Sequence, residues 1–243
     1  MNEATLVVGL GEVGRPLMEV IKDHRNVVGM DIEPIEFNGT CDVMHICFPF
    51  QIRDFVGECA AYINKYKPTL TVINSTVSPG TTRAVFERTG AAIAYSPVRG
   101  KHIKMKDELL HYVKFVGGIN PEIAQKTANH FQSVGMKVKV LSSPEAVELA
   151  KLTETTYFGL LIAWAQEVER YADQFSLNYD EIVSFYEEIK YLPPVKFFPG
   201  VIGGHCVMPN IEILKTIFDS DLLDAIDESN ILKVKRESSK VTS

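Results

Sequence analysis

The sequence is poor in cysteine, in positive charge and in long apolar runs. Its four cysteines show no CxxC spacing and no paired histidine motif, so we expect no metal site and no disulfide framework. A net charge of −6 argues against nucleic acid or an anionic membrane as a partner. No apolar run reaches the roughly 18–20 residues that span a bilayer, and the first residues lack the basic segment of a signal peptide. We therefore expect a cytoplasmic protein.

A glycine-rich turn follows the first apolar run of the chain. The run Leu6 to Val8 leads into Gly9, Gly11 and Gly14, spaced as GxGxxG, and a helical pattern comes next. In this setting the first glycine permits a tight turn, the second lets the backbone approach a pyrophosphate, and the third lets the helix pack on the strand. The N-terminus of such a helix attracts anions. The pattern predicts a dinucleotide site.

The second apolar run, "NVVGMD", ends in Asp31, twenty residues after Gly11. An acid at this place accepts hydrogen bonds from the adenosine ribose, and its charge repels a 2′-phosphate. We therefore expect NAD as the cofactor rather than NADP. Further cofactor contacts are expected at Glu12, Val13, Pro49, Ser75 and Thr76.

Apolar runs and helical patterns alternate through the first 142 residues. Runs at 42–50, 69–77, 91–97 and 111–119 are typical of buried strands. The alternation predicts an α/β fold, with a Rossmann-like, doubly wound and mostly parallel sheet, in an NAD-binding domain of residues 1–142. Ligands of such sheets bind beyond the carboxyl ends of the strands. Within its apolar strand, His45 is predicted to be a hydrogen-bonded core histidine.

From Pro144 onward the pattern is helical, which predicts an all-helical domain of residues 143–243 with a long central helix. The middle of this helix, "YFGLLIAW", is apolar on nearly every face and must be buried on all sides. Either the small domain or a second copy of the chain covers it, and we expect a homodimer through the helix 145–174. The polar end, "RESSKVTS", is predicted to be frayed.

The stretch "FFPGVIGGHCVMPN" places Cys206 in a glycine-rich loop. Most free cysteines act as small buried hydrophobes, whereas loops on rigid scaffolds often carry chemistry. By itself this loop fits both interpretations. Lys151, taken alone, also fits a solvated helix residue, and Thr76 fits a turn or cap residue.

Four stretches, in this order, resemble the nucleotide-sugar dehydrogenases that oxidise UDP-glucose or GDP-mannose to uronic acids. They are "VVGLGEVGRPL", "NSTVSPGTT", "EAVELAKLTETTYFGLLIAWAQEVERYAD" and "PGVIGGHCVMPN". The resemblance covers most of the chain, and its most specific part is GGHC after PG. It implies that Cys206 is a nucleophile that attacks an aldehyde, that Lys151 polarises the substrate oxygen, and that Thr76 lies near the nicotinamide and the catalytic water. A nearby cation, such as Lys151 or His205, favours the thiolate.

The sequence also departs from the family pattern. Val98 stands where the family has a glutamate that helps hydrolysis, Thr155 replaces an asparagine, and Asn210 replaces an aspartate. The family's further nucleotide-sugar-binding domain does not follow the GGHC region in this sequence. The basic loop after Val98 suits a carboxylate or phosphate on the substrate. Substrate contacts are expected at Arg99, Lys101, His102, Thr155, His205 and Asn210.

Three interpretations follow from these features. The preferred one is an NAD-dependent dehydrogenase that acts on an alcohol or aldehyde smaller than a nucleotide sugar, with Cys206, Lys151 and Thr76 as catalytic residues. The second is a hydroxyacid-type dehydrogenase that uses Lys151 as acid and base, with no thiol step. The third is a non-catalytic nucleotide-binding module, or one that pairs with a separate chain supplying a sugar-binding domain.

Overall fold

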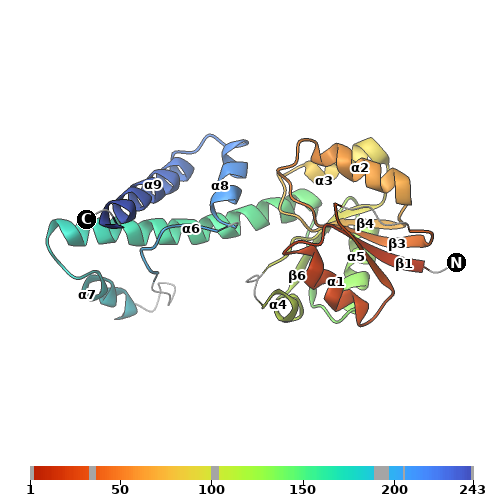
Figure 1. Ribbon diagram of the computed structural model, residues 1–243, viewed down its shortest axis with the longest axis horizontal. Helices are drawn as coiled ribbons and strands as arrows, with labels where there is room; N and C mark the ends of the chain where they lie inside the picture. The colour runs from red at the N-terminus through yellow and green to blue at the C-terminus, as the bar shows by residue number, and fades with distance from the viewer. Residues whose placement is uncertain (1–2, 33–36, 100–103, 189–196, 205, 242–243) are drawn as a thin grey trace. The chain divides into compact units, whose positions relative to one another are not determined.

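The computed structural model describes residues 3–32, 37–99, 104–188, 197–204 and 206–241 (Figure 1). The chain forms two compact units, residues 1–151 and 152–243. We describe each unit by itself. The domain boundary predicted between residues 142 and 143 stays a prediction.

The first unit contains one sheet of seven strands. The strands are β1 (Glu3–Val8), β2 (Val27–Met30), β3 (Thr40–Ile46), β4 (Leu70–Ile73), β5 (Ile93–Tyr95), β6 (Lys114–Gly118) and β7 (Val138–Val140). Their order is β2-β1-β3-β4-β5-β6-β7, and every neighbouring pair is parallel except β5 with β6. The predicted Rossmann-like, mostly parallel sheet is confirmed.

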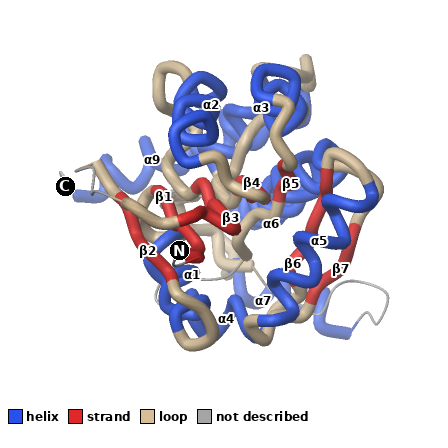
Figure 2. The backbone as a smooth tube through the Cα atoms, turned by 90° about the vertical axis from the view of Figure 1, so that its right-hand side faces the viewer, coloured by secondary structure: helices blue, strands red, loops and turns tan. Residues whose placement is uncertain are grey.

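Helices cover both faces of this sheet (Figures 1 and 2). One face carries α1 (Gly14–Lys22), α4 (Met105–His111) and α5 (Pro121–Ser133), and the other carries α2 (Phe55–Tyr66) and α3 (Thr81–Thr89). Successive strand residues therefore enter two different cores, as Val72 and Ile73 of β4 do. A strand buried on both faces is apolar throughout, which explains the continuous apolar runs of the sequence.

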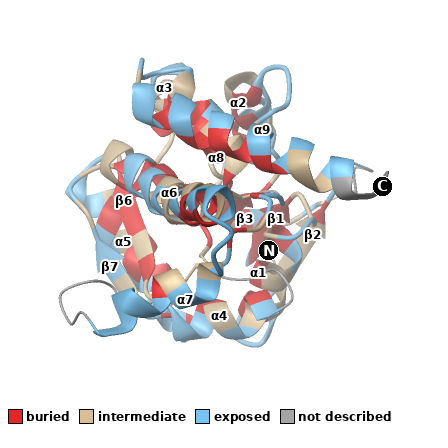
Figure 3. Ribbon diagram, turned by 90° about the vertical axis from the view of Figure 1, so that its left-hand side faces the viewer, coloured by how far each residue is buried: buried red, intermediate tan, exposed pale blue. Residues whose placement is uncertain are grey.

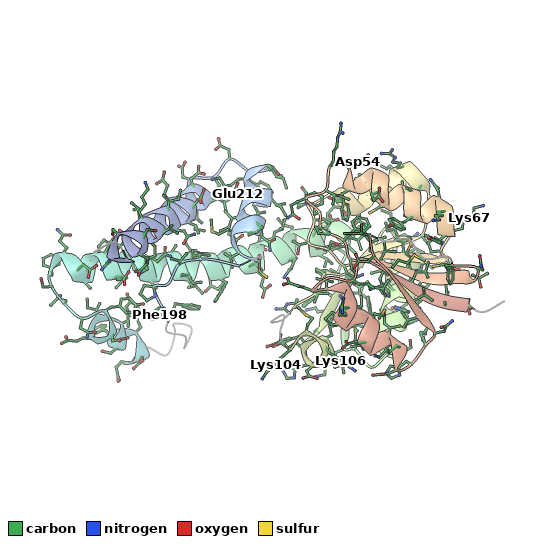
Figure 4. All side chains as sticks on the ribbon, in the orientation of Figure 1. Asp54, Lys67, Lys104, Lys106, Phe198 and Glu212 are labelled. Carbon is green, nitrogen blue, oxygen red and sulfur yellow. The ribbon has the colours of Figure 1, made fainter. Side chains whose placement is uncertain are left out.

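Local signals in the sequence fix the ends of α2. The carboxylate of Asp54 accepts a hydrogen bond of 2.8 Å from the backbone N–H of Gly57, which satisfies a donor of the first turn. Lys67 ends the helix in the left-handed conformation, with φ of 44°. Figure 4 labels both residues at the two ends of the helix. This helix follows β3 and flanks the region where the cofactor is expected.

The second unit is helical, as predicted. It contains the continuation of α6 (Pro144–Gln174), followed by α7 (Tyr179–Ser184), the short 3₁₀ helix η2 (Phe185–Glu188), α8 (Met208–Lys215) and α9 (Asp221–Val241). Gly159 of α6 lies against α8: a Cβ atom added there would be 2.7 Å from Cγ1 of Val207 and 3.4 Å from Cδ1 of Ile211. A glycine at this position therefore lets α8 approach α6 closely.

The prediction of a frayed end from Arg236 onward is wrong, because α9 continues to Val241. Salt bridges to α6 hold this part of the helix in place. Arg236 pairs with Asp173 and, at 3.5 Å, with Glu169. Lys233 pairs with the same Glu169 at 2.6 Å and with Glu237 at 3.0 Å. Polarity alone therefore did not indicate disorder here.

Candidate active site

The glycine turn after β1 has the geometry that its spacing suggests. Gly9 has a φ of +92°, and a Cβ atom added there would lie 2.6 Å from the backbone nitrogen of Phe48. A Cβ atom on Gly14 would lie 1.8 Å from the carbonyl oxygen of Gly9. Neither position has room for a side chain. A Cβ atom on Gly11, in contrast, would meet nothing within 4 Å. The space beside Gly11 is open, as the approach of a ligand would require.

Glu12 and Val13, the two residues before α1, belong to the same turn. Glu12 is exposed and Val13 is half-buried. The N-terminus of α1 therefore begins at an accessible surface, where backbone N–H groups and the helix dipole favour an anion.

Two cavities lie beside Asp31, next to the turn. The larger, of about 530 Å³, is lined by residues that include Gly9, Asp31 and Tyr62. The smaller, of about 210 Å³, shares Asp31 and Tyr62 and is also lined by Tyr66. The carboxylate of Asp31 accepts a hydrogen bond of 3.1 Å from the backbone N–H of Ile32. A volume of several hundred Å³ with a carboxylate at its edge fits one half of a dinucleotide.

The loops after β3 and β4 meet at the same edge of the sheet. The hydroxyl of Ser75 donates a hydrogen bond of 2.6 Å to the carbonyl oxygen of Phe48, which ties the two loops together. Pro49 is exposed and Thr76 is half-buried. Three predicted cofactor contacts, Pro49, Ser75 and Thr76, therefore lie on two adjacent loops.

A buried carboxylate and an ion pair fix the start of α6 against α3. Glu148 is fully buried, and it accepts hydrogen bonds from the backbone N–H groups of Gly80 and Thr82 at 2.7 and 2.9 Å and from the Thr82 hydroxyl at 2.7 Å. Burial raises the pKa of the Glu148 carboxyl, and these donors oppose the rise. Arg83 pairs with Glu145 at 2.5 Å. Two of the four motif stretches thus dock on each other, which fixes the helix that carries Lys151.

Lys114, at the start of β6, is a polar residue of this edge that the sequence reasoning missed. It is only 3% exposed. Its ammonium group donates hydrogen bonds to Oδ1 of Asn74 at 3.3 Å and to the carbonyl oxygens of Ser96 and Pro97 at 2.8 and 3.0 Å. Its pKa is lowered to about 7, chiefly by burial; Cys47 opposes this fall, and the charge of Lys151 adds to it. The available signal was a single lysine inside the apolar run "YVKFVGG".

In the loop after β5, the side chain of Val98 points inward. Val98, which replaces the family glutamate, is buried in the core with Met105 and Leu109. Arg99 places its guanidinium 5.5 Å from the ring centroid of Phe115, a cation–π arrangement. Lys101 and His102, the other predicted basic contacts, lie outside the described residues.

In the second unit, Cys206 lies just before α8 and is half-buried. The positive end of a helix dipole favours negative charge at such a place. The two departures from the family pattern pair with each other: the amide of Asn210 donates to the Thr155 hydroxyl at 2.9 Å, and that hydroxyl donates to the Leu152 carbonyl at 3.0 Å. His205 lies outside the described residues.

Two buried side chains hold the loop that leads to Cys206. Gln166 donates a hydrogen bond of 2.7 Å to the carbonyl oxygen of Gly200. Asn230 accepts from the backbone N–H of Ile202 at 2.8 Å and donates to its carbonyl oxygen at 3.0 Å. The hydroxyl of Ser229 donates to Oε1 of Gln166 at 2.9 Å. The loop is therefore fixed by side chains of α6 and α9, and sequence reasoning assigned no role to these side chains.

The other three cysteines are poor nucleophiles. Cys41, Cys47 and Cys59 are buried, and burial raises the pKa of Cys41 and Cys47 to about 12 and that of Cys59 still higher. Over the part of the chain that the structure describes, no cluster of three or more His, Cys, Asp or Glu side chains could hold a metal ion. Within that same part, no helix has the length and apolar character needed to cross a bilayer.

The predicted site residues thus fall into two groups. The first unit carries Gly9, Gly11, Glu12, Val13, Gly14, Asp31, Pro49, Ser75, Thr76, Arg99 and Lys151, and the second carries Thr155, Cys206 and Asn210.

Residues 145–231 match the central domain of the UDP-glucose/GDP-mannose dehydrogenase family. The UDP-N-acetyl-D-mannosamine dehydrogenase of Methanocaldococcus jannaschii is 28% identical over 182 residues, which cover 68% of this chain and 42% of that protein. The enzyme of the same name from Methanococcus vannielii is 29% identical over 253 residues, covering 83% of this chain and 58% of the relative. The chain thus spans about half the length of these relatives.

Solved structures share the fold. The UDP-D-ManNAc dehydrogenase of Pyrococcus horikoshii superposes with a TM-score of 0.79 at 20% identity, over 95% of this chain and 68% of that one. The UDP-N-acetyl-mannosamine dehydrogenase of Staphylococcus aureus gives 0.81 at 20% identity, over 99% and 70%. The 3-hydroxyisobutyrate dehydrogenase of Mycobacterium tuberculosis gives 0.73 at 15% identity, over 98% and 94%. At these identities the likeness is one of fold.

Proposed function

We propose that the chain is an NAD-dependent oxidoreductase acting on an alcohol or aldehyde group, because residues 145–231 match the central domain of the UDP-glucose/GDP-mannose dehydrogenase family. The observation that carries this proposal is the family match, which contains both Lys151 and Cys206. The glycine turn and the cavity beside Asp31 support it independently, because they lie outside the matched residues.

The residues of the first unit fit a dinucleotide. Gly11 leaves open space at the N-terminus of α1, where a pyrophosphate would lie, and Asp31 borders a cavity of about 530 Å³, where the adenosine would lie. Ser75 and Thr76 follow β4 at the carboxyl edge, where the nicotinamide would lie. NAD, when bound, supplies the acceptor for the hydride that leaves the substrate carbon.

Lys151 and Cys206 have distinct proposed roles. The Lys151 ammonium stabilises the oxygen of the reacting alcohol as it gains negative charge. If the reaction continues past the aldehyde, the Cys206 thiolate forms a bond to the carbonyl carbon, and the carbonyl oxygen takes up a proton. Loss of a second hydride, for which a further NAD would be the acceptor, together with loss of the hydroxyl proton, would leave a thioester, and water would then release the acid and the thiol. Thr76 orients that water.

The departures from the family bear on this last step. Val98 is buried and carries no acid, and Thr155 and Asn210 form a neutral hydrogen-bonded pair. Hydrolysis of the thioester therefore lacks the glutamate that the resemblance implies. We propose that release of the acid is the slow step when the enzyme starts from an alcohol.

The substrate is proposed to be an anionic alcohol, because Arg99 lies in the loop after β5. The relatives are named for UDP-N-acetyl-D-mannosamine, whereas we expect a substrate smaller than a nucleotide sugar. A decisive assay mixes the protein with NAD and records NADH absorbance over nucleotide sugars, hydroxyacids and small aldehydes.

The outcomes of this assay separate the alternatives. Turnover that requires Cys206 supports the thiol mechanism. Hydroxyacid turnover that survives Cys206→Ser would favour the hydroxyacid-type enzyme that uses Lys151 alone. Binding of NAD without turnover on any of these classes would favour the nucleotide-binding module.

We also propose that the chain forms a homodimer through α6. Large apolar side chains of this helix remain exposed in the single chain, among them Tyr157 and Trp164, both at 52%. Contiguous exposed apolar surface of this kind marks protein interfaces. A monomer by light scattering at micromolar concentration would contradict this proposal. A cytoplasmic location is proposed because all four cysteines are free thiols.

A further inference from the structure

Four polar side chains form a continuous buried chain through the first unit. Lys114 of β6 donates to Oδ1 of Asn74 at 3.3 Å, and Nδ2 of Asn74 lies 3.1 Å from Nδ1 of His45. Nε2 of His45 lies 2.9 Å from Nε2 of His130, on α5. All four residues are buried, and Figure 3 shows β6 largely buried. The prediction that His45 is a hydrogen-bonded core residue is confirmed.

The direction of every hydrogen bond in this chain follows from the orientation of the Asn74 amide, whose nitrogen donates to the carbonyl oxygen of Val72 at 3.1 Å and whose oxygen accepts from Lys114. An ammonium group only donates, so the Asn74 oxygen accepts and its amide nitrogen must donate to Nδ1 of His45. His45 then carries its proton on Nε2 and donates to Nε2 of His130. His130 carries its proton on Nδ1, an atom that has no hydrogen-bond partner among the described residues. The orientation of the Asn74 amide, held by Val72 and Lys114, thus selects one tautomer of each ring.

This arrangement of donors and acceptors requires the rings of His45 and His130 to be neutral. Burial lowers the pKa of His45 well below its ordinary value, and the charges of His130 and Lys114 lower it further. Burial and then the charge of Arg25 lower the pKa of His130 to about 4. Each ring therefore offers one donor and one acceptor at neutral pH.

Lys114 also joins two loops of the site. Its three N–H donors meet three acceptors: the side chain of Asn74 and the carbonyl oxygens of Ser96 and Pro97. Asn74 directly precedes Ser75 and Thr76, and Pro97 directly precedes Val98 and Arg99. The bonds to Asn74 and Pro97 therefore set the spacing between the cofactor loop and the substrate loop.

We propose that Lys114 is a positioning residue that fixes these two loops relative to each other and, with the Val72 carbonyl, orders the Asn74–His45–His130 chain behind them. The catalytic part of this proposal rests on the proposed function, whereas the hydrogen-bond direction does not. An ammonium at this place acts through backbone carbonyls and an amide, so its effect is on geometry.

The first test needs neither cofactor nor a variant of Lys114. Two-dimensional ¹⁵N NMR of the full chain, labelled at histidine, distinguishes the two neutral tautomers, with signals assigned through His45→Gln and His130→Gln. We expect a proton on Nε2 of His45 and on Nδ1 of His130 at neutral pH. The opposite tautomers, or a charged ring at either position, would overturn the proposed direction.

The second test compares Lys114→Met with Lys137→Met, a control lysine that is exposed and donates to the His111 carbonyl. We expect Lys114→Met to lower kcat by about tenfold to a hundredfold through misplaced loops, to leave the dissociation constant for NAD unchanged, and to keep the His45 tautomer because the Val72 carbonyl still orients the Asn74 amide. The control should change none of these. Unaltered kcat in Lys114→Met, or an equal loss of kcat in the control, would refute the positioning role. A wild-type protein without turnover would contradict the proposed function, while the NMR test still decides the hydrogen-bond direction.

Discussion

Backbone geometry shapes most of the proposed cofactor site in the first unit, whereas side chains hold the loop of the proposed nucleophile in the second. Gly9, Gly11 and Asp31 lie where regular strands end, and the strand ladder already positions them. Cys206 lies in a segment without regular structure, whose backbone at Gly200 and Ile202 is held by side chains of α6 and α9. A site of the first kind depends on steric fit, and one of the second kind depends on a few buried hydrogen bonds.

The largest expected effect separates the two units by function. Cys206→Ser should abolish oxidation of an aldehyde to an acid, because a serine hydroxyl is a far weaker nucleophile than a thiolate. NAD binding should remain, because the proposed cofactor site lies in the first unit. Steady-state kinetics and calorimetric titration with NAD measure the two effects. Cys41→Ala, at a buried cysteine of β3, is the control; a loss of turnover in this variant too would remove the special role of Cys206.

A pair of glycine variants tests whether the proposed cofactor site of the first unit depends on the lack of room for side chains in its glycine turn. Gly14→Ala should lower the free energy of unfolding by roughly 2–4 kcal/mol, because the methyl group meets a backbone oxygen that cannot move aside. Gly11→Ala should fold normally, because its methyl group enters open space, but should weaken NAD binding. Urea unfolding and NAD titration of both variants provide the measurement. Equal stability loss in the two variants would contradict the geometry of the turn.

The buried charge of Lys114, in the first unit, predicts that the free energy of unfolding depends on pH. The folded pKa of about 7 lies below the ordinary 10.5, so between these values the unfolded chain binds the extra proton. The cost of burying the cation is fully present below pH 7 and is relieved as the pH rises toward 10.5. This group alone should raise the free energy of unfolding by up to about 5 kcal/mol across that window. Lys114→Met should show a flatter pH profile in urea unfolding, and an unchanged slope would contradict the assignment.

Hydrogen bonds to the loop backbone should matter more in the second unit. Asn230→Ala leaves the N–H and C=O of buried Ile202 unpaired, at a cost of roughly 1–3 kcal/mol for each group. It should also slow alkylation of Cys206 relative to the wild type. Asn129→Ala, at an exposed asparagine whose side chain accepts a hydrogen bond from Gln125, is the matched control. Equal effects of the two substitutions would mean that the loop does not depend on its side-chain clamp.

The smallest expected effect concerns the choice of cofactor. Asp31→Ala should weaken NAD by about tenfold, the loss of one hydrogen bond to a charged group, and should relax the rejection of NADP. Asp23→Ala, at an exposed acid that pairs with Lys106, should change neither. Titration of both cofactors measures this, and an unchanged preference in Asp31→Ala would disprove the ribose assignment.

Local patterns predicted the fold well because they reflect local physics. The apolar runs became strands, and the spacing of Gly9, Gly11 and Gly14 matched one turn of known geometry. The missed residues act over long sequence separations: Lys114 bonds to Asn74 forty residues away, and Asn230 bonds to Ile202 twenty-eight residues away. A single sequence carries no periodic signal for such pairs.

Contacts over long sequence separations also explain two further errors: the frayed end predicted from Arg236, and the incomplete role given to the stretch that begins with Glu145. The stretch from Arg236 looked disordered because its partners, Asp173 and Glu169, lie far back in the sequence. The stretch that begins with Glu145 was noted for its lysine, although Glu148 of the same stretch holds the start of α3.

Gly159 has a consequence for the chemistry at Cys206. A methyl group at residue 159 would overlap Val207, the residue that follows the sulfur-bearing position. The separation between the reactive loop and the axis of α6 is therefore set by a bare Cα atom. A larger residue at 159 would force the Val207 side chain or the start of α8 to shift, so the loop that carries Cys206 depends on the absence of a side chain on a different helix.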